Sequence, residues 1–431
     1  MYGGIENACV NGVRQMRFLT RKCTVIVLAL AVSASAADSA EKWTPLFDGQ
    51  TLKGWTNPYT WGKAWAEDGQ ILLQADKKFF LVTEKRYRDF IFEGEVKVPE
   101  GQANSGFMFR CHVEPNRVFG YQAEVDPSAR QWSGGLYDEG RRGWLVPMQD
   151  DPNSAKAFVQ RTKGAFHREG WNRYRIHCVG PSIRIYLNDM LTVNTVDTVD
   201  REGYLAIQHH GEKGQIYRFR NLRIRELSAP KAMAETRNGL PLAFFEDFES
   251  GAGRWVQTDP NAWKVTAADQ GHVYSLYQQS KYEPPVRSPF NIARIKDLSV
   301  SDFVIQARME QTGKEYGHRD MVIVFGYQDP AHFYYVHIAT KADAAANSIF
   351  IVNGQPRTSI AKERTEGTDW STGLHDVRIV RNAATGAIEV FYDHMDKPIM
   401  RAADKTFLSG GLGFGSFDDT GNIDDVIVWG K

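Results

Sequence analysis

The segments "NSGFMFR" (Asn104–Arg110) and "YQAEVDP" (Tyr121–Pro127) alternate apolar and polar residues with a period of two. Because successive side chains of a β-strand point to opposite faces, this alternation predicts two strands, each with one apolar and one polar face. We expect the polar faces to carry Arg110 and His112, and then Gln122, Glu124 and Asp126. The apolar faces predict a packed core, and the polar faces predict a surface that is open to a ligand or to solvent.

Short alternating segments of the same kind fill the chain after residue 40, among them "FIFEGEVKV", "IRIYLND", "FVIQARME" and "FYYVHIA". Turn residues separate them at the spacing that is typical of a β-sandwich, and a long helical pattern is hard to find. The sequence therefore predicts an all-β protein.

The order of these segments repeats along the chain. "FIFEGEV" from Phe90 matches "FVIQARM" from Phe303, and "RYRIHCVGPSIRIYLND" matches "DVRIVRNAATGAIEVFYDH". The polar, proline-bearing stretch between the copies has no strand alternation, as expected of a linker. We predict two tandem jelly-roll sandwiches that arose by internal duplication, over residues 41–228 and 241–431, joined by a linker at 229–240.

The duplication allows the two copies to be compared within one sequence. Our alignment places Ile338 opposite Glu124 and Thr340 opposite Asp126, and the Phe417–Asp418 region opposite His210. The charged face is thus expected in the first copy only. A functional site in the first sandwich is one interpretation, and a solvated sheet face is the other.

Composition narrows the classes of partner. The 52 basic residues balance the 52 acidic residues among the 431 of the chain, so neither nucleic acid nor an anionic membrane surface is favoured. Aromatic residues make up 12%, with 11 tryptophans, which suits stacking on sugar rings and suits ordinary core packing equally well.

The N-terminus has the pattern of a signal peptide. Basic residues at 17, 21 and 22 precede an apolar run, Cys23–Val32, and small residues follow at Ala34–Ala36. We predict a signal peptide over residues 1–36, with Met16 as an alternative start, and a secreted or periplasmic protein without an integral membrane segment in the mature chain. Cys111 and Cys178 would remain, either as a disulfide or as two buried thiols.

Other polar residues are expected to converge on the charged face. In "AIQHHG", alternation puts Gln208 and His210 on one side and His209 on the other, and the loop Gln131–Trp144 supplies charged and aromatic side chains. His210 fits a general base, a metal ligand or a hydrogen-bonded sheet residue. The substrate-binding residues that we predict are Asn104, Gln122, Asp126, Gln208, Tyr137, Asp138, Arg142 and Trp144. Glu124 and Asp126 do not complete the E-x-D-x-x-E signature of jelly-roll glucanases, which argues against a conventional two-carboxylate glycosidase.

Several motifs in order resemble the 3-keto-disaccharide hydrolase domain family: "WTPLFDGQTLKGW", "NSGFMFR", "GYQAEVDP", "GGLYDEGRRGW", "IRIYLND" and "GYLAIQHHG". The resemblance covers about residues 43–227. It implies a concanavalin A-like jelly roll that cleaves glycosides oxidised at C3, by removal of the C2 proton and departure of the C1 substituent, followed by addition of water. Carried onto this chain, it implies Glu124 or His210 as base, Arg110 as oxyanion partner, and Asn104 and Gln208 as sugar contacts. His209 departs from the family, which usually has Asp there.

The second copy resembles a generic concanavalin-type or laminin-G-like jelly roll and would be an accessory sugar-binding domain. Its acidic segments "FFEDFESG" and "SFDDTGNIDD" are interpreted as a calcium position at adjacent strand ends or as acidic turns exposed to water. The sequence predicts a carbohydrate-active enzyme with a glycoside or oligosaccharide substrate and no certain cofactor. The alternative is a non-catalytic protein with two carbohydrate-binding modules in tandem.

Overall fold

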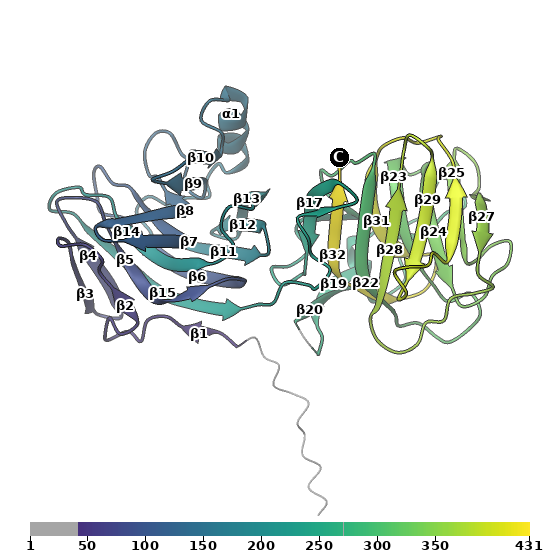
Figure 1. Ribbon diagram of the computed structural model, residues 1–431, viewed down its shortest axis with the longest axis horizontal. Coiled ribbons are helices and arrows are strands. Elements are labelled where there is room, and N and C mark those ends of the chain that lie inside the picture. The colour runs from purple at the N-terminus through teal and green to yellow at the C-terminus, as the bar shows by residue number, and fades with distance from the viewer. Residues whose placement is uncertain (1–41, 270) are drawn as a thin grey trace, which may run out of the picture. The chain divides into compact units, whose positions relative to one another are not determined.

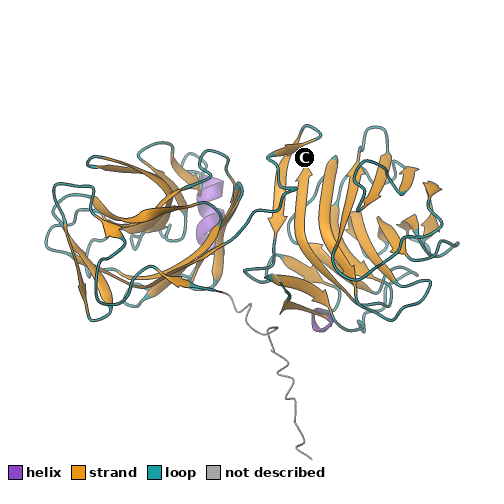
Figure 2. Cartoon of the chain, turned by 60° about the horizontal axis from the view of Figure 1, so that its bottom comes forward, coloured by secondary structure: helices purple, strands orange, loops and turns teal. Residues whose placement is uncertain are grey.

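A computed structural model describes residues 42–269 and 271–431 (Figure 1). The predicted signal peptide lies outside the described residues. Strands dominate, beside one α-helix, α1 (Pro152–Arg161), and one short 3-10 helix, η1 (Pro260–Ala262) (Figure 2). The prediction of an all-β protein with two tandem sandwiches is confirmed. No helix within the described residues is long and apolar enough to cross a membrane.

The first sandwich consists of an eight-stranded and a seven-stranded sheet. The eight-stranded sheet runs β13 (Met190–Val196), β12 (Ser182–Leu187), β11 (Asn172–Val179), β6 (Phe90–Lys97), β15 (Ile216–Glu226), β4 (Gln70–Gln74) and β3 (Lys63–Glu67), with β1 (Thr44–Pro45) beside β15. The seven-stranded sheet runs β10 (Gly143–Val146), β9 (Leu136–Glu139), β8 (Arg117–Val125), β7 (Ser105–Glu114), β14 (Gly203–His209), β5 (Phe79–Tyr87) and β2 (Trp55–Thr56). All neighbouring strands pair antiparallel.

The core of the first sandwich lies between these sheets. Phe107 and Phe109 of β7 and Tyr121 and Ala123 of β8 are fully buried in it, as the period-two alternation predicts. Cys111 and Cys178 are buried free thiols. Burial of these apolar faces leaves the other face of β7, β8 and β14 for polar side chains.

The second sandwich has a ten-stranded and a seven-stranded sheet. The first runs β16 (Thr236–Arg237), β17 (Leu240–Glu246), β32 (Gly421–Gly430), β22 (Phe303–Gln311), β28 (His375–Arg381), β29 (Ala387–Tyr392), β30 (Met400–Ala403) and β27 (Ala361–Arg364), with β20 (His272–Leu276) beside β32 and β19 (Trp263–Ala267) beside β20. The second runs β18 (Trp255–Gln257), β21 (Asn291–Ile295), β31 (Gly411–Ser416), β23 (Asp320–Asp329), β24 (His332–Ala339), β25 (Ser348–Asn353) and β26 (Thr358–Ser359). Strand β16 lies inside the stretch that the sequence analysis treats as a linker.

The two seven-stranded sheets share a register. Phe107 of β7 pairs with Ile207 and Ala123, and Ile323 of β23 pairs with Phe414 and Val336 in the same arrangement. Counting from these pairs, the residue at the level of Glu124 is His337, and the residue at the level of Asn104 is Asp320.

The predicted matches of Glu124 with Ile338 and of Asp126 with Thr340 are therefore wrong by one residue. Ile338 belongs to the core of the second sandwich, whereas Glu124 lies on the outer face of its sheet. Because side chains alternate along a strand, a slip of one position exchanges the two faces. The match of His210 with Phe417 agrees with the register.

Candidate active site

A small hollow of about 180 Å³ lies on the outer face of the seven-stranded sheet of the first sandwich. We call it the site hollow. Its lining residues come from β8, β9, β10 and β14 and from adjoining turns: Lys78, Asn104, Gln122, Glu124, Arg130, Tyr137, Glu139, Trp144, Gln208 and His210. Seven of them are among the residues that the sequence predicts for the site: Asn104, Gln122, Glu124, Gln208, His210, Tyr137 and Trp144.

Glu124 lies on the floor of the site hollow and is only 4% exposed. Its Oε1 accepts a hydrogen bond from Asn104 Nδ2 at 2.6 Å, and its Oε2 accepts one from Gln122 Nε2 at 2.8 Å. Burial raises the pKa of this carboxyl group to about 7, because the two amide donors only partly offset its loss of hydration and Asp126 adds repulsion. The group can therefore take up or release a proton near neutral pH.

Two glutamine side chains beside Glu124 have polar atoms without a protein partner. Gln208 is 1% exposed, and neither its Nε2 nor its Oε1 is hydrogen-bonded. Gln122 Oε1 is also buried and without a partner. Buried amide groups are normally hydrogen-bonded, so these atoms mark a place where a polar ligand completes the structure.

Gly106 makes room for this arrangement. It pairs directly with Glu124 across the β7–β8 ladder, and a Cβ built on it would lie 2.4 Å from Gln122 Cδ. Because such a contact is far inside van der Waals distance, any side chain here would displace Gln122. The glycine of "NSG" thus allows the Gln122 amide to reach Glu124.

The variant Gly106→Ala should lower the free energy of unfolding by about 1–3 kcal/mol, because it overpacks the buried Gln122 side chain. Urea denaturation checks this result. Gly253→Ala is the matched control, since a Cβ at Gly253 meets nothing within 4 Å. Equal stability of both variants would show that Gln122 moves aside without cost.

His210 lies at the mouth of the site hollow, and its side chain is 49% exposed. Its Nδ1 is 2.9 Å from Glu212 Oε1, and Glu212 Oε2 accepts a hydrogen bond from Tyr217 Oη at 2.8 Å. Tyr217 Oη in turn accepts from the backbone N–H of Asn104 at 2.9 Å. This chain of contacts orients the His210 ring relative to the Asn104–Glu124 pair.

His209 points into the core, as the alternation predicts. Its Nδ1 accepts a hydrogen bond from Gly211 N at 3.0 Å, and its Nε2 donates to Gln215 O at 3.1 Å. Burial lowers the pKa of His209 and favours the neutral ring. His209 is therefore a structural residue that holds the turn after β14.

The rim of the site hollow contains two charged residues that were not predicted, Lys78 and Arg130, and also Glu139, which belongs to the predicted loop Gln131–Trp144. Lys78 Nζ forms an ion pair with Glu139, and the Arg130 guanidinium stacks 4.8 Å from the ring centroids of both Trp132 and Trp144. Lys78 lies in the turn before β5, and Arg130 lies in the loop after β8, so strand periodicity gives no signal for either. Only the spacing of Arg130 four residues after Asp126 hints at their ion pair.

The structure does not bring Arg110 to the site hollow. A bulge interrupts the β7–β8 ladder between Phe109 and His112, and Arg110 has a φ of 46°. Its fully buried guanidinium donates to Arg88 O at 2.8 Å and to Gly180 O at 2.7 Å. The predicted placement is wrong because the bulge turns this side chain away, and Arg110 is left with a structural role.

Asp126, Asp138 and Arg142 also lie outside the lining of the site hollow. Asp126 accepts from Arg130 Nε at 2.8 Å and so positions the stacked guanidinium. Asp138 is fully buried on the opposite side of β9 from Tyr137, where it forms ion pairs with Arg141 and Arg142. These three predictions are wrong in place, since each charge is already paired within the protein.

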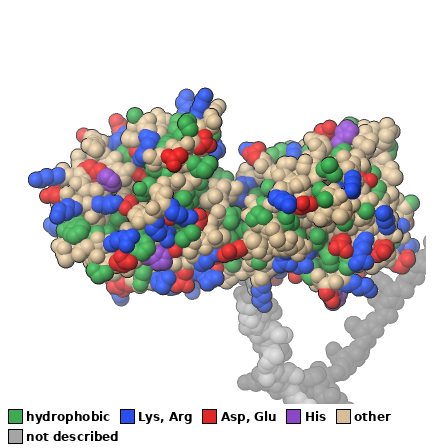
Figure 3. Space-filling view, turned by 45° about the horizontal axis from the view of Figure 1, so that its top comes forward, with side chains coloured by type: hydrophobic (Ala, Val, Ile, Leu, Met, Phe, Trp, Pro, Cys, Tyr) green, Lys and Arg blue, Asp and Glu red, His purple; other side chains and the backbone are tan. Residues whose placement is uncertain are grey.

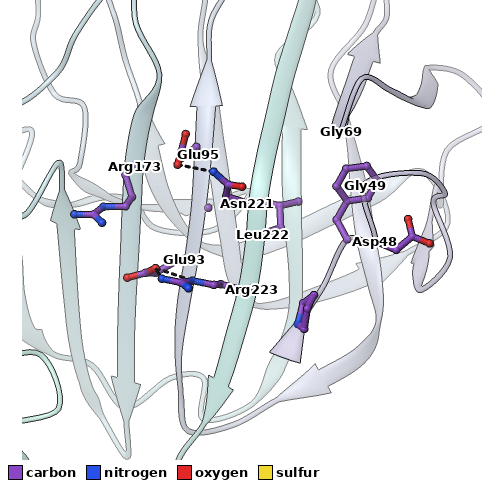
Figure 4. A pocket seen from close by; sticks show the side chains of 12 residues that line it. Asp48, Gly49, Gly69, Glu93, Glu95, Arg173, Asn221, Leu222 and Arg223 are labelled. Atoms are coloured by element: carbon purple, nitrogen blue, oxygen red, sulfur yellow. Dashed lines mark hydrogen bonds and ion pairs between the residues drawn. The ribbon is translucent and has the colours of Figure 1, made fainter. Parts of the chain in front are cut away.

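A larger hollow, of about 510 Å³, lies against the eight-stranded sheet (Figure 4). Two of its three carboxylates are already paired, Glu93 with Arg175 and Arg223, and Glu95 with Arg220 and Asn221, and the third, Asp48, accepts hydrogen bonds from its own turn. Carboxylates that are already paired with arginines have little remaining capacity to bind a ligand. Size alone therefore does not make this hollow the better candidate.

Metal-ligand geometry does not favour the site hollow. Within the described residues, one group brings three ligand atoms within 4.8 Å of one another, and it consists of Asp320, Asp418 and Asp419 of the second sandwich. The two acidic segments singled out in the sequence do meet, because β17 pairs with β32 and Asp247 lies near Asp424, but this meeting point does not include the group of three carboxylates. Charges of both signs are interspersed on the visible face in the space-filling view (Figure 3).

Comparison with known proteins finds one similar family. Residues 42–225 match the family described as 3-keto-alpha-glucoside-1,2-lyase-like domains. The match covers nearly all of the first sandwich and less than half of the chain. The match confirms the resemblance drawn from the motifs, and it spans the strands that form the site hollow. No curated protein matches the chain.

Solved structures resemble parts of the chain at a distance. A Parabacteroides distasonis protein to which glycosyl hydrolase activity is ascribed has 20% identity and a TM-score of 0.33, over 44% of this chain and 95% of its own. The carbohydrate-binding module CBM66 of Bacillus subtilis has 19% identity and a TM-score of 0.32, over 41% and 97%. The tandem CBM22 modules of Paenibacillus barcinonensis Xyn10C have 10% identity and a TM-score of 0.36, over 91% and 97%. None of these likenesses supports a function for the first sandwich.

Proposed function

We propose that the first sandwich cleaves 3-keto-glycosides by β-elimination, with Glu124 as the base. The observation that carries this proposal is the buried Glu124 carboxyl group, whose pKa is raised to about 7 and whose hydrogen bonds come from uncharged amides. A general base is most effective when its pKa lies near the working pH. The family match supplies the substrate class.

The chemistry needs one base and one acid. A ketone at C3 acidifies the C2 proton, so Glu124 takes that proton and the C2–H electron pair forms the enolate. The enolate then forms the C1=C2 double bond as the C1–O bond breaks, and the departing oxygen takes a proton. His210 at the mouth of the site hollow is placed to donate that proton, and water then adds across the double bond.

Stabilisation of the enolate falls to donors that line the site hollow. Arg110 cannot stabilise the enolate, because its guanidinium is bound by backbone carbonyl groups away from the site hollow. Among the lining residues, the Gln208 amide, the Lys78 ammonium and the Arg130 guanidinium can donate, and the unpartnered Gln208 Nε2 is free to donate to a sugar oxygen. Trp144 and Tyr137 offer ring faces for the sugar or its substituent.

Export is part of the proposal, since the N-terminal pattern is that of a signal peptide and sugar polymers occur outside the cell. We also propose that residues 41–228 and 241–431 are separate domains. The proposal does not include a sugar-binding surface on the equivalent face of the second sandwich. There the buried side chains of Tyr335, Phe350 and Phe417 form an apolar cluster.

The test incubates the full chain with a 3-keto-glucoside and with its unoxidised parent, and follows release of the aglycone. Turnover of the keto form alone is the expected result, because only a C3 ketone acidifies the C2 proton. Equal turnover of both forms would indicate a conventional glycosidase. Binding of either form by calorimetry without any release would establish the alternative, a carbohydrate-binding module.

A further inference from the structure

The shared register of the two seven-stranded sheets leads to a second cluster of ionisable groups. At the level of Asn104 and Glu124 the second sandwich has Asp320 and His337, with His337 Nε2 3.3 Å from Asp320 Oδ2. Asp320 is fully buried, Asp419 is 6% exposed, and Asp418 is exposed to solvent. Asp320, Asp418 and Asp419 form what we call the acidic cluster, with one carboxylate oxygen of each within 4.8 Å of the others.

Backbone and side-chain hydrogen bonds fix two of these carboxylates. Asp320 Oδ1 accepts from Ser416 Oγ at 2.7 Å, and Asp419 Oδ2 accepts from Asp320 N at 2.8 Å and from Tyr316 Oη at 2.9 Å. Within the described residues, Asp419 Oδ1 has no hydrogen bond. The turn after β31 therefore presents a pre-oriented carboxylate oxygen.

A separate observation indicates that something is bound here. Gln311, at the end of β22, is 6% exposed, and neither atom of its side-chain amide has a hydrogen-bond partner. Gln311 Nε2 and Asp419 Oδ1 both lie 2.7 Å from the position that a Cβ on Gly313 would occupy. An unpartnered buried amide thus faces the same small space as the free carboxylate oxygen, and its nitrogen and oxygen are interchangeable by a rotation of the amide.

The charge of the acidic cluster is not balanced by the protein. No ion pair with Lys or Arg involves Asp320, Asp418 or Asp419 in the part of the chain that the structure describes, and His337 is the one ionisable neighbour in an ion-pair contact. Carboxylates that are buried together without a cation are costly. By contrast, Glu93 and Asp138 of the first sandwich are each paired with two arginines.

We propose that the acidic cluster and Gln311 bind one calcium ion. All the donors are oxygens of carboxylates or an amide, which suit a hard cation such as Ca²⁺, and they come from the turn after β31 and from the ends of β22 and β23. Mg²⁺ demands a stricter octahedron at shorter distances and binds more weakly to such a set. The ion reaches the site past the exposed Asp418, and it ties the turn after β31 to the ends of β22 and β23.

The test uses the full chain stripped with a chelator. Isothermal titration with CaCl₂ should show one ion per chain with a Kd at or below about 10⁻³ M, as in extracellular modules. Saturating calcium should raise the Tm by about 5 °C, since binding stabilises the folded state. Terbium emission sensitised by the nearby Tyr316 reports occupancy directly.

Asp418→Asn and Asp419→Asn should each weaken calcium binding at least tenfold and remove the Tm shift. Asp418 is exposed, so its variant should fold even if that of Asp419 does not. Asp329→Asn is the matched control, because Asp329 is an acidic residue at the other end of the same strand, β23, and should bind as the parent does. No binding at millimolar calcium, or unchanged binding by the Asp418 variant, would overturn the proposal. These readouts do not depend on turnover in the first sandwich.

Discussion

The variant Glu124→Gln should lose about a hundredfold to ten-thousandfold in kcat on a 3-keto-glucoside, which is the contribution of a positioned general base. Glutamine keeps the size of the side chain and can still accept from Asn104 Nδ2, but it cannot take the C2 proton. KM should change little, because the sugar contacts remain. Steady-state release of the aglycone measures both constants.

A control shows whether the Glu124→Gln variant folds as the parent does. Because burial raises the pKa of Glu124 above its unfolded value, the ionised group destabilises the fold increasingly as the pH rises from about 4.5 through 7. Glu124→Gln removes that charge, so at pH 8 its Tm should be no lower than that of the parent. Glu93→Gln, which changes a buried carboxylate of the other sheet, should keep kcat per folded molecule. Full activity of Glu124→Gln would exclude Glu124 as the base.

The pH dependence of kcat/KM should follow the ionisation of the same group. The ionised carboxylate is the active form, so the rate should approach a tenfold fall for each pH unit well below 7, and it should fall about fiftyfold between pH 7 and pH 5. Above pH 7 the profile should level off, because Glu124 is then ionised. The spontaneous elimination of the substrate in alkali has to be subtracted at each pH.

The pH profiles of two variants show whether Glu124 or another group causes the acidic limb. In the Glu124→Gln variant the acidic limb near pH 7 should vanish from whatever activity is left. In the His210→Gln variant that limb should stay. An acidic limb near pH 4.5 in the parent would mean that Glu124 is hydrated in solution and that its burial here does not govern the reaction.

The sequence is informative where the strands are regular. Glu124, Gln122 and Gln208 lie on uninterrupted stretches of β8 and β14, so counting by two places all three on the outer face, and the structure agrees. The same counting gives the core residues of β7. Regular pleating is a local property, so it can be predicted from neighbouring residues alone.

Prediction fails where the backbone leaves that regularity. The bulge at Arg110 gives this residue of β7 a left-handed backbone conformation, and no local sequence pattern predicts it. Lys78 and Arg130 come from turns whose paths depend on packing between distant segments. The misalignment of Glu124 with Ile338 has a related origin, since unequal loops in the two copies hide a shift of one position.

The group of Arg130, Trp132 and Trp144 bears on which glycosides the proposed enzyme would accept. The two indoles pack edge-to-face with ring centroids 4.7 Å apart, and the guanidinium lies 4.8 Å from both centroids, so the three side chains hold one another in place. Under the proposed function this rigid group at the rim of the site hollow would contact the aglycone, and it would accept a planar aglycone more readily than a bulky branched glycan. The range of accepted aglycones would then depend on this rim and not on the proton transfer at Glu124.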